Sequence, residues 1–537
     1  MDIIEKEKKK RTILYGLLVT VLVLIGVTYA YYRITKTQTN SNVIGTRTCL
    51  NTTLTEETSE IVLSDAFPIS DEDGLKQSPF TFTLTNNCDS YVKVTIALVS
   101  EYRTSTNTAY LKDNYVKSNL STKGTNDGSS VILSTLSLGE VDTNTQGYVL
   151  KTTGLKNKEA KSFDLRLWLD SETTNEQGLN KTWKGKIVVN VVAADEPAPA
   201  PNGWYEAGSG TLLASLRDSN ILKTPITTPG TAISTADEAL LASAEDDNGT
   251  SYYFRGAVTN NYVEFANKCW RIVRVGGDGS VKLILHNDNT TKVANPCDSA
   301  NNSSSAAFAR YSGETYESAF NTNNDDNAYV GFKYGTPGSS KYEATHANTN
   351  KSTILTNLET WYNNNLKTYE KVIDDTVWCN DKTNVTDTSF DPWNLGDVNG
   401  LGYAKNVTYY GATQRLASTS GSAGGTGPSL KCNGKLSKIN SKVGLITADE
   451  LAYAGYATKL KYANTYLQES ASADWCSLSP GYFNGGYAGF WCVQGSTGGI
   501  GIKRMPYLTA VRPSISLKPS TNVTGDGTSS SPYIISM

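Results

Sequence analysis

The stretch KGKIVVNVVAADEPAPAPNG, residues 184–203, decides how this chain is organised. Its first half reads as a β-strand. Its second half repeats proline at every other position, and proline lacks the amide hydrogen that a sheet needs and favours a stiff polyproline II spacer. We therefore predict that residues 195–203 are a linker between one domain at residues 45–194 and another at residues 204–537.

Short alternating runs fill the region before the linker. FTFTL at Phe80–Leu84, VKVTI at Val92–Ile96 and FDLRLWL at Phe163–Leu169 place apolar side chains at every second position. Strands with one buried face show this period of two. Glycine, asparagine, aspartate and serine separate the runs, and no helical period appears. This region is therefore predicted to form an all-β antiparallel sandwich.

The region after the linker mixes strand and helix signals. Ser352 precedes apolar residues spaced by three and four, which is the pattern of a capped helix with one buried face. Thr447 precedes Asp449 and Glu450, so a second helix is expected to begin there with its acids in the first turn. Arg512 is expected to form a buried ion pair with one of these two acids. Strand-like runs surround both helices, which predicts an α+β domain.

An uncharged run, TILYGLLVTVLVLIGVTYAYY, extends over Thr12–Tyr32 and is long enough to cross a bilayer as a helix. Basic residues at 6–11 precede it, so we expect a cytoplasmic N-terminus and an extracellular remainder. Residues 1–32 are thus predicted to be a cytoplasmic tail and transmembrane helix, followed by a stalk at residues 33–44. Two interpretations stay open: a single-pass plasma-membrane anchor, or a signal segment that is cut near Ala30 and releases the protein.

Eight cysteines divide into two before the linker and six after it. None forms a CxxC motif or a cluster with histidine, so structural disulfides in an oxidising compartment are the favoured interpretation. Pairing within domains forces Cys49–Cys88. The other six allow several combinations, among which we favour consecutive pairing: Cys269–Cys297, Cys379–Cys432 and Cys476–Cys492.

Composition excludes several classes of function. Lysine and arginine total 49 against 52 aspartates and glutamates, so the net charge of −3 argues against nucleic-acid binding. Two histidines, His286 and His346, leave little room for a histidine-built zinc site or catalytic triad. Acidic turns at Asp246–Gly249, Asp325–Asn327 and Asp397–Gly400 offer oxygen ligands for Ca²⁺, but none completes a calcium-binding loop. Surface turns are the favoured interpretation, and no cofactor is expected.

The first domain resembles secreted fibre-forming proteins of the TasA/camelysin type. In the apolar run before this domain the resemblance is carried by VTYAYY at residues 27–32. In the domain itself it is carried by FTFTLTNNCDSYVKVTI at 80–96, LRLWLD at 165–170 and WKGKIVVNV at 183–191. It implies a jelly-roll-like sandwich that can polymerise into biofilm-matrix fibres, and an N-terminal segment that a dedicated signal peptidase removes.

The second domain resembles C-type-lectin-like surface domains of Gram-positive gut bacteria, a fold shared with relatives of formylglycine-generating enzymes. The resemblance is carried by WRIV at 270–273, the Trp361-Tyr362 helix, GLITADE at 444–450, WCSLSP at 475–480 and VRPSISL at 511–517. It implies a fold rather than an activity, because this fold carries ligand binding more often than catalysis.

In such a fold the segment YFNGGYAGFW, residues 482–491, would lie near the ligand-binding face. Aromatic side chains on a glycine-rich loop stack on sugars or on apolar partner surfaces. The candidate ligand-binding residues are Tyr482, Phe483, Asn484, Tyr487 and Trp491. A place in the core is the competing interpretation for most of them, and Tyr482 and Tyr487 are expected to be the most exposed.

Together these observations predict a non-catalytic bacterial cell-surface protein for adhesion or ligand recognition, with a glycan or a surface protein as ligand. The alternative is a structural subunit of a biofilm-matrix or pilus-like fibre that self-assembles through the first domain. A third interpretation is an enzyme of the formylglycine-generating type. That chemistry requires a close cysteine pair, whereas the spacing of Cys476 and Cys492 suits a staple between strands.

Overall fold

The computed structural model describes residues 52–56, 61–63, 66–142, 145–194, 196–231, 233, 238–459, 464–495, 497–504 and 507–536. The chain divides into two compact units between Ala198 and Pro199, within the stretch that reads as a linker. The apolar run Thr12–Tyr32, the stalk and Cys49 lie outside the described residues. Among the described helices, none is long and apolar enough to span a bilayer.

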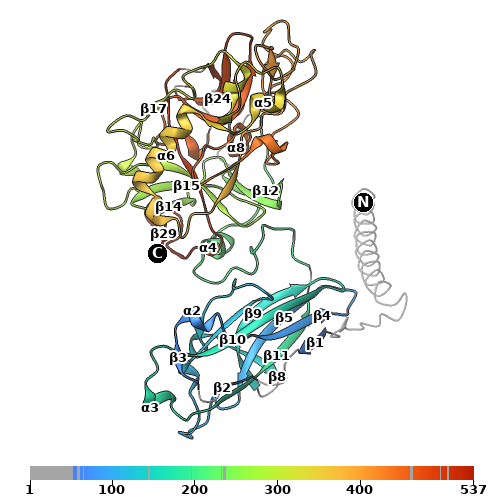
Figure 1. Cartoon of the computed structure of the whole chain (residues 1–537), viewed down its shortest axis with the longest axis vertical. Helices are drawn as coiled ribbons and strands as arrows, with labels where there is room; N and C mark the ends of the chain where they lie inside the picture. Colours follow the sequence, from blue (N-terminus) through green and yellow to red (C-terminus); the bar gives the residue numbers. More distant parts are fainter. Residues whose placement is uncertain are drawn as a thin grey trace, which may run out of the picture. The chain divides into compact units, whose positions relative to one another are not determined.

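Two sheets form the N-terminal unit (Figure 1). The first has the strand order β1-β4-β10-β6-β7, with β3 beside β10, and the second has the order β2-β11-β5-β9-β8. The first sheet comprises β1 Thr52–Glu56, β3 Pro68–Ile69, β4 Phe80–Asn86, β6 Val116–Thr122, β7 Val131–Ile132 and β10 Ala160–Asp170. The second comprises β2 Ile61–Leu63, β5 Val92–Ser100, β8 Leu138–Asp142, β9 Thr145–Leu155 and β11 Trp183–Ala193. Two short helices, α2 Asp71–Gly74 and α3 Asn175–Gly178, lie in the connections.

The two sheets of this unit share one hydrophobic core. Phe82 of β4 and Phe163 of β10 are buried, with ring centres 5.5 Å apart. Val94 and Ile96 of β5, on the other sheet, belong to the same buried cluster. Each strand therefore contributes one apolar face, as the period of two in the sequence predicts, and the predicted β-sandwich is confirmed.

The C-terminal unit has two larger sheets and two two-stranded ones. The eight-stranded sheet comprises β12 Leu240–Asp246, β13 Gly249–Arg255, β14 Tyr262–Phe265, β15 Lys268–Val275, β16 Val281–Asn287, β27 Ser514–Leu517, β28 Val523–Thr524 and β29 Tyr533–Ile535. The six-stranded sheet comprises β17 Glu317–Ser318, β21 Thr408–Tyr409, β23 Trp475–Phe483, β24 Ala488–Gln494, β25 Gly499–Arg504 and β26 Thr509–Ala510. The small sheets pair β18 Lys333–Tyr334 with β19 Asn350–Lys351, and β20 Thr376–Cys379 with β22 Lys438–Ser441.

Five α-helices pack with these sheets in the described part of the unit. They are α4 Leu212–Ser219, α5 Tyr342–His346, α6 Thr353–Asn365, α7 Gly411–Leu416 and α8 Ala448–Ala454. A short 3₁₀ helix, η5, covers Asn327–Val330. Side chains from both larger sheets and from the helices form one continuous core, so the unit is a mixed α and β structure.

Helix α6 confirms the helix that the spacing of apolar residues predicts. The hydroxyl of Ser352 accepts a hydrogen bond from the amide of Leu355 at 3.3 Å, so Ser352 caps the helix. Leu358 and Trp361 are fully buried on one face. Trp361 meets Trp270 of β15 edge to face, with ring centres 6.1 Å apart, which anchors the helix to the eight-stranded sheet.

The substitution Leu358→Ala is expected to lower the free energy of unfolding of the C-terminal unit by about 2–5 kcal/mol, because it leaves a cavity in this core. Urea unfolding followed by tryptophan fluorescence measures the loss. Asn363→Ala, an exposed position on the same helix, serves as the control and should change stability by less than about 0.5 kcal/mol. Equal losses in the two variants would contradict the buried face of α6.

Candidate functional site

Three disulfides staple the C-terminal unit, and they join the pairs that consecutive order predicts. Cys269–Cys297 attaches a loop to β15, Cys379–Cys432 joins the end of β20 to a distant loop, and Cys476–Cys492 links β23 to β24. The three predicted connections are therefore confirmed. The expected Cys49–Cys88 pair stays a prediction, because Cys49 lies outside the described residues.

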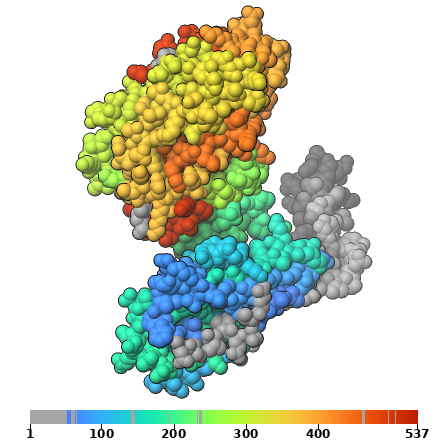
Figure 2. Space-filling model, viewed as in Figure 1, coloured from blue at the N-terminus to red at the C-terminus, as the bar shows by residue number. Residues whose placement is uncertain are grey.

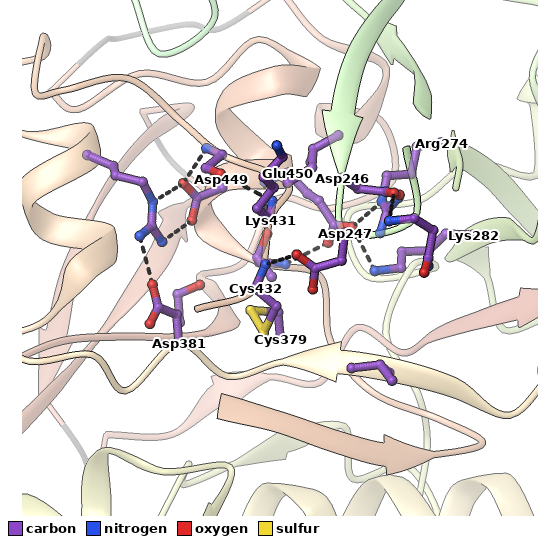
Figure 3. Close-up of a pocket in the computed structure, with 17 residues that line it drawn as sticks. Asp246, Asp247, Arg274, Lys282, Cys379, Asp381, Lys431, Cys432, Asp449 and Glu450 are labelled. Atoms are coloured by element: carbon purple, nitrogen blue, oxygen red, sulfur yellow. Dashed lines mark hydrogen bonds and ion pairs between the residues drawn. A yellow bond between two sulfur atoms is a disulfide. The ribbon is translucent and has the colours of Figure 1, made fainter. Parts of the chain in front are cut away.

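A cavity of about 70 Å³ lies beside the second of these disulfides (Figure 3). Strand β12, strands β15 and β16, the end of β20 and the first turn of α8 contribute its walls. Helix α8 begins as predicted: Thr447 and Glu450 form a capping box, in which each side chain accepts a hydrogen bond from the other's amide at 2.9 Å. The two acids of this turn are thereby fixed at the wall of the cavity. We name this cavity the charged cavity.

Glu450 is buried between two cations of the eight-stranded sheet. It accepts from Arg274 Nε at 2.8 Å and from Lys282 Nζ at 2.7 Å, and Arg274 also reaches Asp246 at 2.8 Å. Burial alone would raise the pKa of Glu450. The charges of Lys282 and Arg274 and the hydrogen bond from Lys282 outweigh burial and lower this pKa to about 2.

Asp449, the neighbouring acid, faces a different cation. Both of its oxygens accept from Arg415 of α7, at 2.6 Å and 2.8 Å, and Arg415 also donates to Asp381 at 2.7 Å. Burial lowers the pKa of Arg415, but the charges of Asp449 and Asp381 outweigh it and hold the pKa above its ordinary value. Arg415 is thus a fixed, doubly paired cation.

The expected ion pair of Arg512 with Asp449 or Glu450 is wrong. Arg512 is buried, but it donates to the carbonyl oxygens of Leu285 and Leu467, at 2.9 Å and 2.6 Å. Its guanidinium also lies 4.7 Å from the centre of the Trp475 ring. Backbone carbonyls and an aromatic face therefore stabilise this cation, and the acids at the start of α8 are left to other partners.

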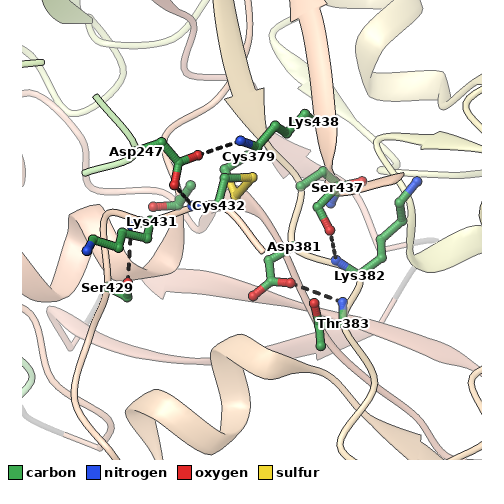
Figure 4. Close-up of a disulfide and its surroundings, with 12 residues drawn as sticks. Asp247, Cys379, Asp381, Lys382, Thr383, Ser429, Lys431, Cys432, Ser437 and Lys438 are labelled. Carbon is green, nitrogen blue, oxygen red and sulfur yellow. Dashed lines mark hydrogen bonds and ion pairs between the residues drawn. A yellow bond between two sulfur atoms is a disulfide. The ribbon is translucent and has the colours of Figure 1, made fainter. Parts of the chain in front are cut away.

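The disulfide Cys379–Cys432 fixes the loop on the opposite wall of the charged cavity (Figure 4). The amide of Cys432 donates to Asp247 at 3.2 Å, and Asp247 in turn pairs with Lys438 of β22 at 2.7 Å. Asp449 accepts from the amide of Ser429, at 3.0 Å, in the same loop. Covalent, ionic and hydrogen bonds together therefore hold this loop in one position.

The four buried carboxylates around the charged cavity are Asp246, Asp381, Asp449 and Glu450. Each already accepts from an arginine or a lysine. Such paired groups position segments of the chain and do not serve as a free general base. The charged cavity is thus a structural junction that sets the geometry of the surfaces around it.

The predicted ligand-binding residues lie on the β23–β24 hairpin but do not share one environment. Phe483 and Trp491 are fully buried in the core, so they are not available to a ligand. Tyr482, Asn484 and Tyr487 are half-buried near the turn, and Asn484 holds the turn by accepting from the amide of Tyr487 at 2.9 Å. These three residues are therefore the members of the set that keep part of their surface exposed.

Tyr482 and Tyr487 belong to a longer line of rings that we name the aromatic row. The ring of Trp393 lies 6.1 Å from that of Tyr482, and Tyr482 lies 6.1 Å from Tyr487. The guanidinium of Arg504 on β25 lies 3.9 Å from the centre of the Tyr487 ring and ends the row. Sequence reasoning missed Trp393 and Arg504, although a tryptophan in a glycine- and asparagine-rich loop is a signal that could have found the first.

Aspartates in two of the acidic turns that offered Ca²⁺ ligands form hydrogen bonds and ion pairs within the protein. Asp246 accepts from Arg274 and from the amide of Gly277, and Asp326 accepts from the amides of Ala328 and Gly338. Within the part of the chain that the structure describes, no three or more histidine, cysteine, aspartate or glutamate side chains gather to hold a metal ion.

In comparisons with known proteins, no family model and no curated protein matches this chain.

The substitution Glu450→Gln is expected to lower the free energy of unfolding by about 3–5 kcal/mol at pH 7, because it leaves buried Lys282 and partly buried Arg274 short of a counter-charge. The pKa of Glu450 in the folded protein, about 2, is below its ordinary value of 4.5. Its ionised form therefore contributes stability that is fully present above about pH 4.5 and is lost as the pH falls toward 2. Urea unfolding between pH 7 and pH 2 measures both effects.

Glu314→Gln, at an exposed position, is the matched control for this experiment and should leave stability and its pH dependence unchanged. The wild type should lose more stability between pH 4.5 and pH 2 than Glu450→Gln does. If the stability of the wild type and that of Glu450→Gln changed in parallel with pH, the carboxylate of Glu450 would not be the group that Arg274 and Lys282 stabilise.

The double substitution Cys379→Ala and Cys432→Ala is expected to lower stability by about 4 kcal/mol, because the disulfide closes a loop with a sequence separation of 53 residues. Calorimetry of the full chain measures the loss. Peptide mapping of the non-reduced wild type should recover the Cys379–Cys432 linkage. A loss below about 1 kcal/mol, or a different linkage, would contradict the role of this staple.

Proposed function

We propose that this protein is a non-catalytic, membrane-tethered surface protein of a Gram-positive bacterium and that its C-terminal unit recognises a glycan or a protein ligand. In this proposal Thr12–Tyr32 is the anchor, and the N-terminal sandwich is a jelly-roll-like stalk that holds a C-type-lectin-like unit away from the membrane. Cleavage near Ala30 would give a secreted form of the same molecule.

The aromatic row is the observation that carries this proposal. Half-exposed tyrosine and tryptophan rings with an arginine beside them are the groups most enriched where proteins bind partners. The disulfide Cys476–Cys492 fixes the hairpin that bears Tyr482 and Tyr487. A ring that is already held in place loses little conformational freedom on binding, and this supports recognition rather than a purely structural role.

Binding of the full chain to cultured cells and to arrays of glycans and surface proteins tests this function. The variants Tyr482→Ala and Tyr487→Ala are expected to bind about tenfold more weakly or worse, because each removes a ring from the row. Tyr507→Ala is the matched control, since Tyr507 is 60% exposed and is not part of the aromatic row. No binding of the wild type to any cell or array would overturn the proposal.

A fibre subunit is the second candidate, and the edges of the N-terminal sheets favour it. Strands β1 and β7 end one sheet, and strands β2 and β8 end the other. Edge strands offer backbone groups to a second chain, and Leu138 of β8 is 43% exposed. Electron microscopy of the full chain would distinguish the two functions: fibres support a subunit, whereas single particles support the surface receptor.

A further inference from the structure

A second concave site lies beside the start of α6, away from the charged cavity. It has a volume of about 210 Å³. We name it the amide groove, and its lining includes Thr322, Asn323, Tyr329, Tyr334, Thr356 and Asn357. In Figure 2 the visible face of the C-terminal unit is largely yellow, the colour of the chain around residue 350, so this part of the chain is at the surface.

The lining of the amide groove is polar but almost uncharged. Among the described residues it consists of side-chain amides, threonine hydroxyls and two tyrosines, with Lys351 as the one charged side chain and no carboxylate. Lys351 pairs with Glu359 at 2.5 Å, so its charge is compensated. Amides and hydroxyls both donate and accept hydrogen bonds. Such a lining suits a neutral ligand that carries many hydroxyl groups.

The groove is held open by hydrogen bonds in its floor. Buried Asn321 accepts from the amide of Thr353 at 3.2 Å and donates to the carbonyl of Tyr329 at 2.9 Å. The amide of Thr322 donates to the hydroxyl of Thr353 at 3.2 Å, and Asn357 donates to Ser318 at 2.8 Å. The amides of Ile354 and Leu355 also have partners, so the first amides of α6 are occupied and a ligand must be recognised by side chains.

Two tyrosines give the groove an aromatic side. Tyr329 and Tyr334 meet edge to face with ring centres 5.4 Å apart, and Tyr334 is half-buried. A sugar ring has a flat apolar face and an edge rich in hydroxyl groups. An aromatic ring can pack against such a face. The volume is below the roughly 300–1,000 Å³ of pockets that enclose drug-sized ligands, which matches one small ring better than a larger molecule.

The amide groove adjoins the hairpin that carries the aromatic row. The amide of Ala488 donates to the carbonyl of Asn324 at 2.8 Å, one residue beyond the groove. Phe320, just before the groove, stacks on Phe490 of β24 with ring centres 3.5 Å apart. The segment that lines the groove therefore contacts β24, the second strand of the hairpin that carries Tyr482 and Tyr487.

From this arrangement we propose that the amide groove binds a neutral saccharide, with the amides and hydroxyls of Asn323, Thr356 and Asn357 bonding its hydroxyl groups and Tyr334 packing against the ring. This inference rests on the proposed recognition function and names the chemical class of one ligand. It assigns that ligand to a site apart from the aromatic row.

Saturation-transfer NMR and calorimetric titration of the full chain test the proposal. The probes are the methyl glycosides of glucose, galactose, mannose, N-acetylglucosamine and N-acetylgalactosamine. The wild type should bind at least one of them. The double variant Asn323→Ala and Thr356→Ala should weaken that binding about tenfold or more, since it removes two hydrogen-bonding groups from the groove.

The matched control is the double variant Thr360→Ala and Asn363→Ala, one turn farther along α6. Thr360 donates to the carbonyl of Thr356 at 2.9 Å, just as Thr356 donates to the carbonyl of Ser352 at 3.2 Å, but neither control residue lines the groove. Equal effects of the two double variants, or no effect of either, would overturn the assignment. Tyr334→Phe keeps the ring and should lose less binding than Tyr334→Ala.

Failure of this inference can be told apart from failure of the recognition function. A wild type that binds cells or protein arrays but none of the five glycosides overturns the saccharide groove and leaves recognition through the aromatic row intact. A wild type that binds neither cells, arrays nor glycosides overturns both.

Discussion

Two consecutive carboxylates at the start of α8 hold together segments of the C-terminal unit that are far apart in the chain. Adjacent residues on a helix point in different directions, so Asp449 and Glu450 meet different cations. Glu450 reaches Arg274 and Lys282 on the eight-stranded sheet, and Asp449 reaches Arg415 on α7. Removing one member of a buried ion pair leaves a charge without a partner, which strongly destabilises the folded protein. These ion pairs therefore hold the three segments together in the folded unit.

This constraint explains how a unit with long polar loops keeps a defined surface. The chain between Cys379 and Cys432 is rich in glycine, serine, threonine and asparagine, and loops of this length rarely persist inside a compact domain without structure of their own. Here β21 and α7 form within the segment, the disulfide joins its two ends, and Arg415 of α7 pairs with Asp449 of α8. Trp393 lies within this segment. Its place in the aromatic row therefore depends on the disulfide and on the ion pairs of Arg415 at the charged cavity.

Local signals in the sequence predicted local structure well. The caps at Ser352 and Thr447 began the two expected helices, because a hydroxyl that accepts a backbone hydrogen bond acts over three residues. Alternation of apolar residues in β4, β5 and β10 predicted the sandwich, because successive side chains of a strand point to opposite faces and this pattern is also local. Consecutive pairing of the six cysteines was a choice among several combinations; the structure confirms it, although Cys379 and Cys432 are 53 residues apart.

Partners that only tertiary structure brings together were not predictable. A sequence separation of 176 residues lies between Arg274 and Glu450, and no local pattern marks such a pair. Arg512 was matched to the wrong acids for this reason. The candidate site divided in the same way. Its tyrosines were found, but Phe483 and Trp491 alternate into the core. Helix α6 was predicted, but its meeting with the segment around Asn323 to form the amide groove was not.

The distribution of charge gives these observations a common physical basis. Charged residues make up 19% of the chain, below the usual quarter, and those around the charged cavity are neutralised by one another. Apart from Lys351 and Arg504, the amide groove and the aromatic row are made of tyrosine, tryptophan, asparagine and threonine. Hydrogen bonds and ring contacts from such groups are little affected by salt, whereas exposed charges are screened within about 8–10 Å. In the function proposed here, the affinity for an uncharged ligand would therefore change little with ionic strength, because paired charges maintain the fold and mainly neutral groups make the contacts.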